Sequence, residues 1–234
     1  MRRFRALGWM FLVTFVLFLL NKGRGYYTGP SYVMLLAAGC VWFENWLGAR
    51  TTTTPRRVGF GLAWTTQVAG CLLGIILMKP IGAIHSTFWE FRSEVSGDLF
   101  VEMVGWQELT AQVADIYQSI PESEKPKTVI LAGNYGEAGA LDLYGDAYGL
   151  PRIISGSNSY WHRGYGDPEP EIVIVVGFEV DYAGRFFKSC EFSGTVTNSD
   201  HVKNEETTWH TGLYVCREPR DPWSEMWQEM QWYQ

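Results

Sequence analysis

The sequence predicts a membrane α-helical segment of three transmembrane helices, followed by a soluble α/β domain with a mainly parallel, Rossmann-like sheet. The first observation behind this prediction is charge. Residues 1–84 contain nine Lys and Arg and one acid, Glu44, whereas residues 85–234 contain ten basic and 24 acidic residues. The second observation is that long apolar stretches occur only in the basic part. We therefore expect a transmembrane region at 1–84 and an extracytoplasmic α/β domain at 85–234.

Three apolar stretches are candidates for transmembrane helices: Ala6–Leu20, Tyr32–Leu47 and Gly59–Met78. A helix that crosses a bilayer needs about 20 residues, and the third stretch alone reaches this length without its flanks. With interfacial residues included, we expect helices at about residues 6–21, 28–47 and 58–78. Aromatic residues, which typically anchor helices at the membrane surface, lie near the ends of the second stretch: Tyr26, Tyr27, Trp42 and Trp46.

The positions of the basic residues predict the orientation of these helices, because cytoplasmic loops are enriched in Lys and Arg. Arginines at positions 2, 3 and 5 place the N-terminus in the cytoplasm, and three more in residues 49–57 return the chain there. The third helix then leads outward, so the acidic domain is expected outside the cytoplasm. An alternative reading makes Arg2–Leu20 a cleavable signal peptide, since it combines a basic start with a short apolar stretch.

The elements of the outer domain follow from apolar spacing. A helix is expected over Met103–Ile120, where apolar residues recur at helical spacing and Pro121 ends the pattern. Strands are expected at Thr128–Ala132, Arg152–Ser155, Glu171–Phe178, Cys190–Val196 and Gly212–Cys216. Helices are expected at Glu137–Tyr148, Asp181–Ser189 and Pro222–Tyr233, and the last should pack its apolar stripe on the domain. Apolar strands that alternate with helices are typical of a parallel sheet covered on both faces.

A glycine-rich segment, Gly133–Gly139, follows a predicted strand and opens a predicted helix, as in a dinucleotide-binding turn. Its spacing is G-x-x-G-x-x-G rather than G-x-G-x-x-G, and Glu137 in the first turn would oppose an anion. The acid that such sites place after the next strand is missing, since no acid follows that strand before Asp167. A tight strand-to-helix turn is the favoured reading.

The segment Ser155–Gly166 is the richest polar and aromatic run, and it follows the predicted strand at the edge where open α/β sheets bind ligands. Its rings could stack on a sugar while its polar groups bond the hydroxyls. The alternative is a loop whose aromatic side chains fill the gap between domain and membrane, and the sequence leaves both readings open. The candidate sugar or acceptor contacts are Asn158, Tyr160, Trp161, His162 and Arg163.

Several site types find no support in the sequence. The four histidines lack metal-ligand spacing, and neither H-E-x-x-H, C-x-x-C nor G-x-S-x-G occurs, so we expect no metal, no cofactor and no hydrolase site. We also expect no nucleic-acid partner. Cys190 and Cys216 lie on predicted strands of the outer domain, where they could form a disulfide or remain two buried thiols.

Lys22 and Arg24 form the first outward connection, beside Tyr26 and Tyr27. Two cations at the outer interface could bind a lipid phosphate, because guanidinium groups recognise phosphate through paired hydrogen bonds. Ordinary interfacial anchoring is the alternative. The candidate carrier-phosphate contacts are Lys22, Arg24, Tyr26 and Tyr27.

Six segments, in order along the chain, resemble one family. They are Lys22–Tyr32 (KGRGYYTGPSY), Gly105–Leu109 (GWQEL), Gly133–Gly145 (GNYGEAGALDLYG), Leu150–Trp161 (LPRIISGSNSYW), Val202–Glu206 (VKNEE) and Leu213–Arg217 (LYVCR). The sequence is thereby similar to the C-terminal part of bacterial polytopic glycosyltransferases. These are the dolichyl-phosphate-mannose protein mannosyltransferase-like and aminoarabinose-transferase-like enzymes of glycosyltransferase family 39, with GT-C architecture.

The resemblance implies a multi-pass protein of the bacterial inner (plasma) membrane that moves a sugar from a polyprenyl-phosphate carrier to an outer-face acceptor. The family's acidic catalytic residue lies in its first outer loop, which nothing here matches. Sugar transfer needs a general base, typically a carboxylate, and Glu137 or Asp142 are candidates only in principle. We therefore expect a portion that is inactive alone, with the bilayer, the lipid-linked sugar and a separate chain carrying the N-terminal half as partners. The alternative is a membrane-anchored glycan-binding or partner-binding module without catalysis.

Overall fold

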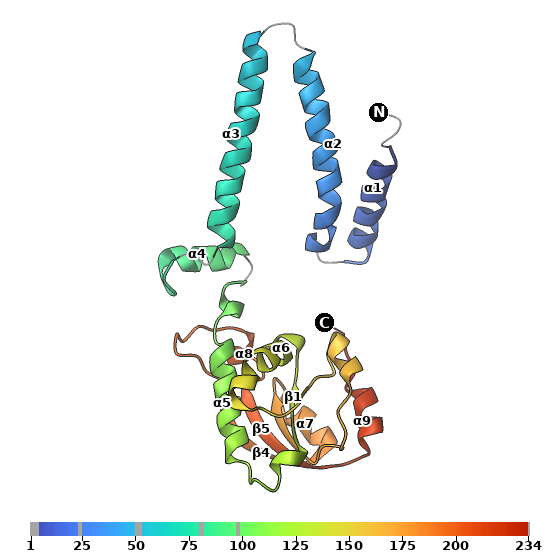
Figure 1. Ribbon diagram of the computed structural model, residues 1–234, viewed down its shortest axis with the longest axis vertical. Coiled ribbons are helices and arrows are strands. Elements are labelled where there is room, and N and C mark those ends of the chain that lie inside the picture. Colours follow the sequence, from blue (N-terminus) through green and yellow to red (C-terminus); the bar gives the residue numbers. More distant parts are fainter. Residues whose placement is uncertain (1–4, 23–24, 50–52, 80–81, 97–98, 234) are drawn as a thin grey trace. The chain divides into compact units, whose positions relative to one another are not determined.

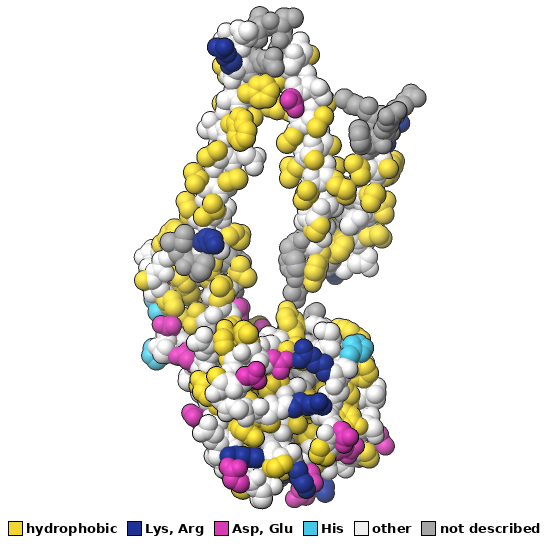
Figure 2. All heavy atoms as spheres, in the orientation of Figure 1, with side chains coloured by type: hydrophobic (Ala, Val, Ile, Leu, Met, Phe, Trp, Pro, Cys, Tyr) yellow, Lys and Arg dark blue, Asp and Glu magenta, His cyan; other side chains and the backbone are white. Residues whose placement is uncertain are grey.

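The computed structural model describes residues 5–22, 25–49, 53–79, 82–96 and 99–233. The chain divides into two compact units, Met1–Ile76 and Leu77–Gln234 (Figure 1). Apolar side chains cover the visible surface of the first unit, whereas charged side chains gather on the second (Figure 2).

The described residues of the first unit form three helices and a short 3-10 turn. They are α1 (Arg5–Leu20), η2 (Gly25–Thr28), α2 (Gly29–Gly48) and α3 (Thr53–Met78). Pro30 lies in the first turn of α2, where a missing amide donor costs little. The helices α2 and α3 approach closely where Gly59 faces Leu47, since a Cβ atom on Gly59 would lie 2.5 Å from Leu47 Cδ2.

The prediction of three transmembrane helices is wrong. Among the described residues, one helix is long and apolar enough to cross a membrane, Arg57–Met78 within α3. The apolar helix α1 has 16 residues, fewer than the roughly 20 that a span requires. The helix α2 has 20 residues, but polar positions such as Glu44 and Asn45 dilute its apolar character.

The second unit is an α/β domain with a five-stranded sheet of order β2-β1-β3-β5-β4. Its strands are β1 (Thr128–Ala132), β2 (Ile153–Ile154), β3 (Ile172–Val176), β4 (Phe187–Thr195) and β5 (Gly212–Pro219). Its helices are α4 (Thr87–Ser96), α5 (Trp106–Ser119), α6 (Tyr135–Tyr144), α7 (Val180–Phe186), α8 (Glu205–Thr208) and α9 (Trp223–Glu229). Short 3-10 turns are η3 (Val101–Met103), η4 (Lys125–Lys127), η5 (Gly145–Tyr148) and η6 (Asn158–Arg163).

The sheet is mixed, so the prediction of a mainly parallel, Rossmann-like sheet is wrong. The strand β1 pairs in parallel with β2 and β3, whereas β5 pairs antiparallel with both β3 and β4. A parallel neighbour needs a long crossover connection, usually a helix. The segment between β4 and β5 holds only the four-residue α8, and β5 returns antiparallel beside β4.

Apolar side chains cover both faces of β1 and β3, because successive strand residues point to opposite sides. Ile130 and Ile174 pack with α5 and α6 on one face. Val129 and Val173 pack with α7 and α9 on the other. Trp223, Trp227 and Met230 belong to this second cluster, so the C-terminal helix packs on its own domain, as predicted.

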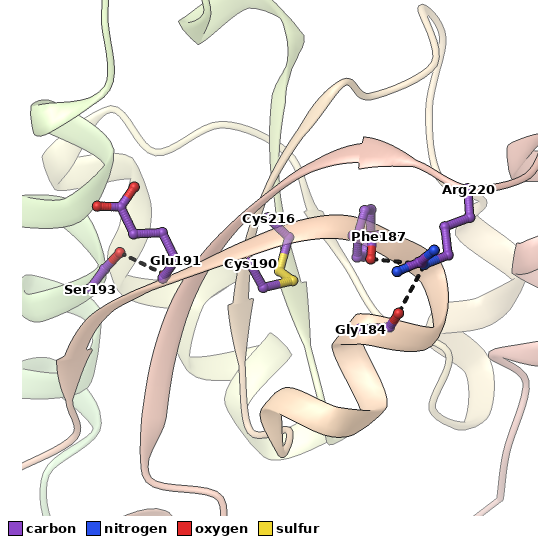
Figure 3. Close-up of a disulfide and its surroundings, with 7 residues drawn as sticks. All are labelled: Gly184, Phe187, Cys190, Glu191, Ser193, Cys216 and Arg220. Carbon is purple, nitrogen blue, oxygen red and sulfur yellow. Dashed lines mark hydrogen bonds between the residues drawn. A yellow bond between two sulfur atoms is a disulfide. The ribbon is translucent and has the colours of Figure 1, made fainter.

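A disulfide joins Cys190 of β4 to Cys216 of β5, one of the two alternatives that the sequence left open (Figure 3). The two cysteines are register partners in the antiparallel pair. Nearby, Arg220 Nε donates to the carbonyls of Gly184 and Phe187 at 3.0 and 3.1 Å. The segment after β5 is thereby fixed to the junction of α7 and β4.

Candidate functional site

The carboxyl ends of the parallel strands β2, β1 and β3 lie at one edge of the sheet, and β5 begins there. From β1 the chain continues through α6 to β2 on one side, whereas from β3 it continues through α7 to β4 at the far side. The position between β1 and β3 is therefore a topological switch point, where open α/β sheets bind ligands. The loops at this edge are the candidate functional site.

The turn after β1 is closed by its own carboxylate. Glu137 Oε2 accepts hydrogen bonds from the backbone N–H groups of Gly133 and Asn134 at 2.9 and 3.1 Å. The Asn134 side chain in turn accepts from Glu137 N–H at 2.8 Å, which completes a capping box. The amides that would cradle a phosphate are thus bonded to Glu137, in agreement with the reading as a tight turn.

The loops after β1 and β3 meet without space for a side chain. A Cβ atom on Gly133 would lie 2.3 Å from the Gly177 carbonyl oxygen, and one on Gly177 would lie 2.1 Å from Glu137 Oε2. Gly177 also has a φ of +75°, a conformation that glycine adopts without a steric penalty. The Glu137 carboxyl group therefore fills the switch point between the two strands.

Burial raises the pKa of Glu137 to about 7, against the lowering effect of the hydrogen bonds from Asn134 and Gly133. The side chain is buried, with 3% of the residue exposed. The charges of Glu206 and Glu205 add to the increase. At neutral pH, Glu137 is therefore divided between its neutral and charged forms.

Glu206 is a second buried carboxyl group beside this turn. Burial raises its pKa to about 7, with further increases from the charges of Glu102 and Glu205, while a hydrogen bond from the Asn134 side chain lowers it. Its Oε2 atom is buried, and no described residue donates a hydrogen bond to it. Asn134 therefore links Glu137 and Glu206, and these three residues are called the carboxyl network below.

An open pocket of about 500 Å³ lies at the same edge of the sheet, where Glu179 follows β3 and His210 precedes β5. His210 Nδ1 lies 3.2 Å from Glu179 Oε1. Trp209 is 64% exposed beside this pair. Tyr214 and the exposed Phe192 meet edge to face with ring centroids 5.8 Å apart. This aromatic pocket is lined by Glu179, Phe192, Thr208, Trp209, His210, Thr211, Gly212 and Tyr214.

Two of the five predicted sugar contacts form one polar cluster against α6. Tyr160 Oη donates to Asp142 Oδ2 at 2.9 Å, and Arg163 Nη1 donates to the same oxygen at 2.6 Å. The guanidinium of Arg163 lies 4.2 Å from the Tyr160 ring centroid. Burial, followed by the hydrogen bond to Asp142, raises the pKa of Tyr160. Arg163 and Asp142 also border an open polar pocket of about 390 Å³ with Asp146 and Arg152.

The other three predicted contacts do not belong to this polar cluster. Trp161 Nε1–H donates to the Trp227 carbonyl at 2.8 Å, and Trp227 Nε1–H donates to the Trp161 carbonyl at 3.1 Å. This reciprocal pair ties η6 to α9. His162 is exposed with its ring centroid 5.2 Å from that of Trp161. Asn158 has a φ of +50°, and its N–H donates to the Trp232 carbonyl at 3.0 Å.

The predicted carrier-phosphate contacts lie in the first unit. Lys22 is exposed in the turn after α1, and the Tyr27 ring lies 6.1 Å from that of Phe18. Arg24 and the Tyr26 side chain lie outside the described residues. A separate apolar groove of about 930 Å³ runs between α2 and α3, lined by Phe43, Trp46, Leu47, Val58, Gly59, Leu62, Ala63, Thr66, Gln67, Gly70 and Cys71.

Glu206 and the aromatic pocket were absent from the sequence predictions. A signal existed for the first, because Asn204 is typical of a helix N-cap and the acids after it suit a first turn. Across the part of the chain that is described, no group of three or more His, Cys, Asp or Glu residues is placed to hold a metal ion. Comparison with protein-family models, with curated proteins and with solved structures gives no match to this chain.

Proposed function

We propose that the chain is the C-terminal portion of an integral-membrane glycosyltransferase that takes a sugar from a polyprenyl-phosphate carrier. In this proposal the aromatic pocket of the α/β domain holds the sugar or the acceptor. The family resemblance of the sequence supplies the substrate class. The observation that carries the proposal is the aromatic pocket itself, with Trp209 beside the Glu179–His210 pair.

The lining of this pocket suits a carbohydrate. Sugars present C–H faces that pack on aromatic rings, and Trp209 offers an exposed ring at the mouth. Glu179 can accept a hydrogen bond from a sugar hydroxyl, and His210 can donate or accept one. Because Glu179 engages His210 at Nδ1, we propose that Nε2 of this histidine contacts the ligand. It could also take a proton from an acceptor hydroxyl, the step that sugar transfer requires.

The first unit supports the carrier part of the proposal. The apolar helix α3 is suited to lipid, and the groove between α2 and α3 is lined mainly by apolar side chains. A polyprenyl chain is a branched hydrocarbon that such a groove could hold.

The proposal can be tested with the full chain reconstituted in nanodiscs. The probes are methyl α-mannoside, observed by saturation-transfer NMR, and radiolabelled polyprenyl-phosphate mannose, observed by filter binding. We expect Trp209→Ala and His210→Ala each to weaken binding of the mannoside by about tenfold or more, as for central contacts of a binding site. The matched control is Tyr148→Ala, which removes another exposed aromatic side chain, outside the pocket.

The outcomes separate the two candidate functions. Because the portion is expected to be inactive alone, saturable binding of both the mannoside and the radiolabelled lipid carrier would support the transferase portion. Binding of the mannoside without binding of the lipid carrier would favour the membrane-anchored glycan-binding module. Equal binding by wild type, Trp209→Ala and Tyr148→Ala would remove the aromatic pocket from the proposal.

A further inference from the structure

The helix α4 carries an apolar stripe that the domain leaves uncovered. Phe88, Phe91 and Val95 are all exposed, and Phe91 and Val95 are 55% and 54% exposed. At about 100° per residue, these three positions fall within one narrow sector of the helix. Leu99 and Met103, which follow α4 in the sequence, are exposed as well.

Of the other side chains of α4, some are buried against the domain and others are exposed to solvent. Trp89, Arg92 and Ser93 form the side that is buried, and Trp89 packs with Phe100 and Val202. The acids Glu90 and Glu94 are exposed on the remaining side. The apolar stripe therefore lies between a side fixed to the domain and a side that suits water.

Arg92 joins α4 to residues 77 and 79 of the second unit, where α3 ends. Its side chain is 1% exposed, and Nη2 donates to the carbonyl oxygens of Leu77, at 3.2 Å, and Lys79. The last carbonyls of a helix have no partner within the helix, and a cation there is also favoured by the helix dipole. The guanidinium lies 4.3 Å from the Phe100 ring centroid, which adds a cation–π contact.

This attachment indicates what contacts the exposed apolar stripe of α4. The helix α3 is suited to crossing a bilayer, and its apolar stretch within residues 57–78 is not buried by protein. Its final turn marks the level at which the chain leaves the hydrocarbon, and Arg92 holds α4 at that level. A helix with an apolar sector beside an acidic one is typical of a segment that lies in the membrane interface.

We propose that α4 lies in the membrane interface, with Phe88, Phe91 and Val95 inserted between lipid headgroups. The proposal rests on α3 spanning the membrane, as in the proposed function. The exposed charges of α4 are acidic, and its one cation, Arg92, is buried. Insertion therefore depends on apolar contact and not on attraction to anionic lipids.

Spin labels can test this in the full chain, reconstituted in nanodiscs of phosphatidylcholine. Single cysteines replace Phe91 or Val95, with Glu90→Cys and Glu94→Cys as matched controls on the same helix. The background carries Cys40→Ala and Cys71→Ala and keeps the disulfide. Power saturation compares collisions of the label with oxygen, which concentrates in lipid, and with a water-soluble nickel chelate. All four α4 sites are exposed, so the labels disturb no packed contact.

We expect the ratio of oxygen to nickel accessibility to be several-fold higher at positions 91 and 95 than at 90 and 94. The ratio should not change when phosphatidylglycerol is added. Nickel access at 91 and 95 equal to that at 94 would place the stripe in water. Protection from both reagents would place it against protein, and either result overturns the proposal. Leu72→Cys on α3 distinguishes failure of the α4 proposal from failure of its premise. A water-exposed label at this position would show that α3 does not span the membrane.

Discussion

Glu137 serves two roles that favour opposite protonation states. As the partner of the Gly133 and Asn134 amides it is stabilised when charged, because it accepts both hydrogen bonds. As a buried group near Glu206 it is stabilised when neutral. The backbone of Gly177 lies against the carboxyl oxygens of Glu137, where a Cβ atom would clash with them. Burial has the larger effect, and the pKa of Glu137 therefore lies near neutrality rather than near 4.5.

Stability should therefore depend on the protonation of Glu137. Because the folded pKa is raised from 4.5 to about 7, the folded state binds the proton more tightly than the unfolded chain. The protonated Glu137 side chain therefore adds about 3 kcal/mol to the free energy of unfolding. This contribution is fully present below about pH 4.5 and is lost as the pH rises through 7. Glu137→Gln removes this titration. Between pH 4.5 and 8, the wild type should lose stability relative to Glu137→Gln, as measured by denaturant unfolding in detergent.

The exposed Glu90→Gln serves as the control for this experiment, because it removes one carboxyl group without touching the carboxyl network. Its unfolding should follow the wild type at every pH. If Glu137→Gln also follows the wild type, the raised pKa is not a property of the folded domain.

At the scale of elements, the disulfide joins the two strands that complete the mixed sheet. It closes a loop across a sequence separation of 26 residues, and constraining such a loop in the unfolded chain contributes about 3 kcal/mol. The double variant Cys190→Ala and Cys216→Ala should lower the free energy of unfolding of the α/β domain by about 2–4 kcal/mol. The pair Cys40→Ala and Cys71→Ala is the control and should leave it unchanged, since both lie outside this domain. Equal unfolding of the two double variants would show that the bond contributes no stability.

The sequence was sufficient to predict where single strands lie along the chain, but not the directions in which they pair. The strand β1 has the residues that its apolar run predicts, Thr128–Ala132, because a run of buried residues is a local signal. The strand β5 runs antiparallel to its neighbours because the connection before it contains no crossover helix. The spacing of apolar residues does not predict the direction of a strand. Most residues of β4 are exposed, unlike the buried strands of a parallel sheet. The strand also begins at Phe187, within the segment that was predicted to continue the preceding helix to Ser189.

The candidate site was predictable to the same limited degree. Glu137 could be recognised from its place in the first turn of α6, since that relation spans four residues. The pairing of Glu179 with His210 joins residues 31 positions apart and depends on β5 returning beside β3. Similarly, Glu206 and Asn134 are separated by 72 positions in the sequence and meet only in the folded domain. Contacts of this kind follow from topology, which the sequence pattern misassigned.

At the scale of the whole molecule, the division of charge is the feature with the widest consequence. The basic residue at 50 precedes α3, those at 56 and 57 lie near its start, and the acidic part of the chain follows the helix. Because positive segments stay in the cytoplasm, α3 should carry its C-terminal end outward. The disulfide of the second unit is consistent with this direction, since such bonds persist in oxidising compartments.

Labelling of single cysteines can establish this orientation. In a background with Cys40→Ala and Cys71→Ala, Thr53→Cys lies at the start of α3 and Asp221→Cys lies in the α/β domain, and both positions are exposed. We expect an impermeant maleimide to label Asp221→Cys in intact bacterial spheroplasts and Thr53→Cys only after lysis, because α3 separates the two across the membrane. The reverse pattern would place the domain in the cytoplasm, where the reducing environment disfavours the disulfide. Labelling of both positions in intact spheroplasts would mean that α3 does not span the membrane, and the interfacial placement of α4 would then lose its basis.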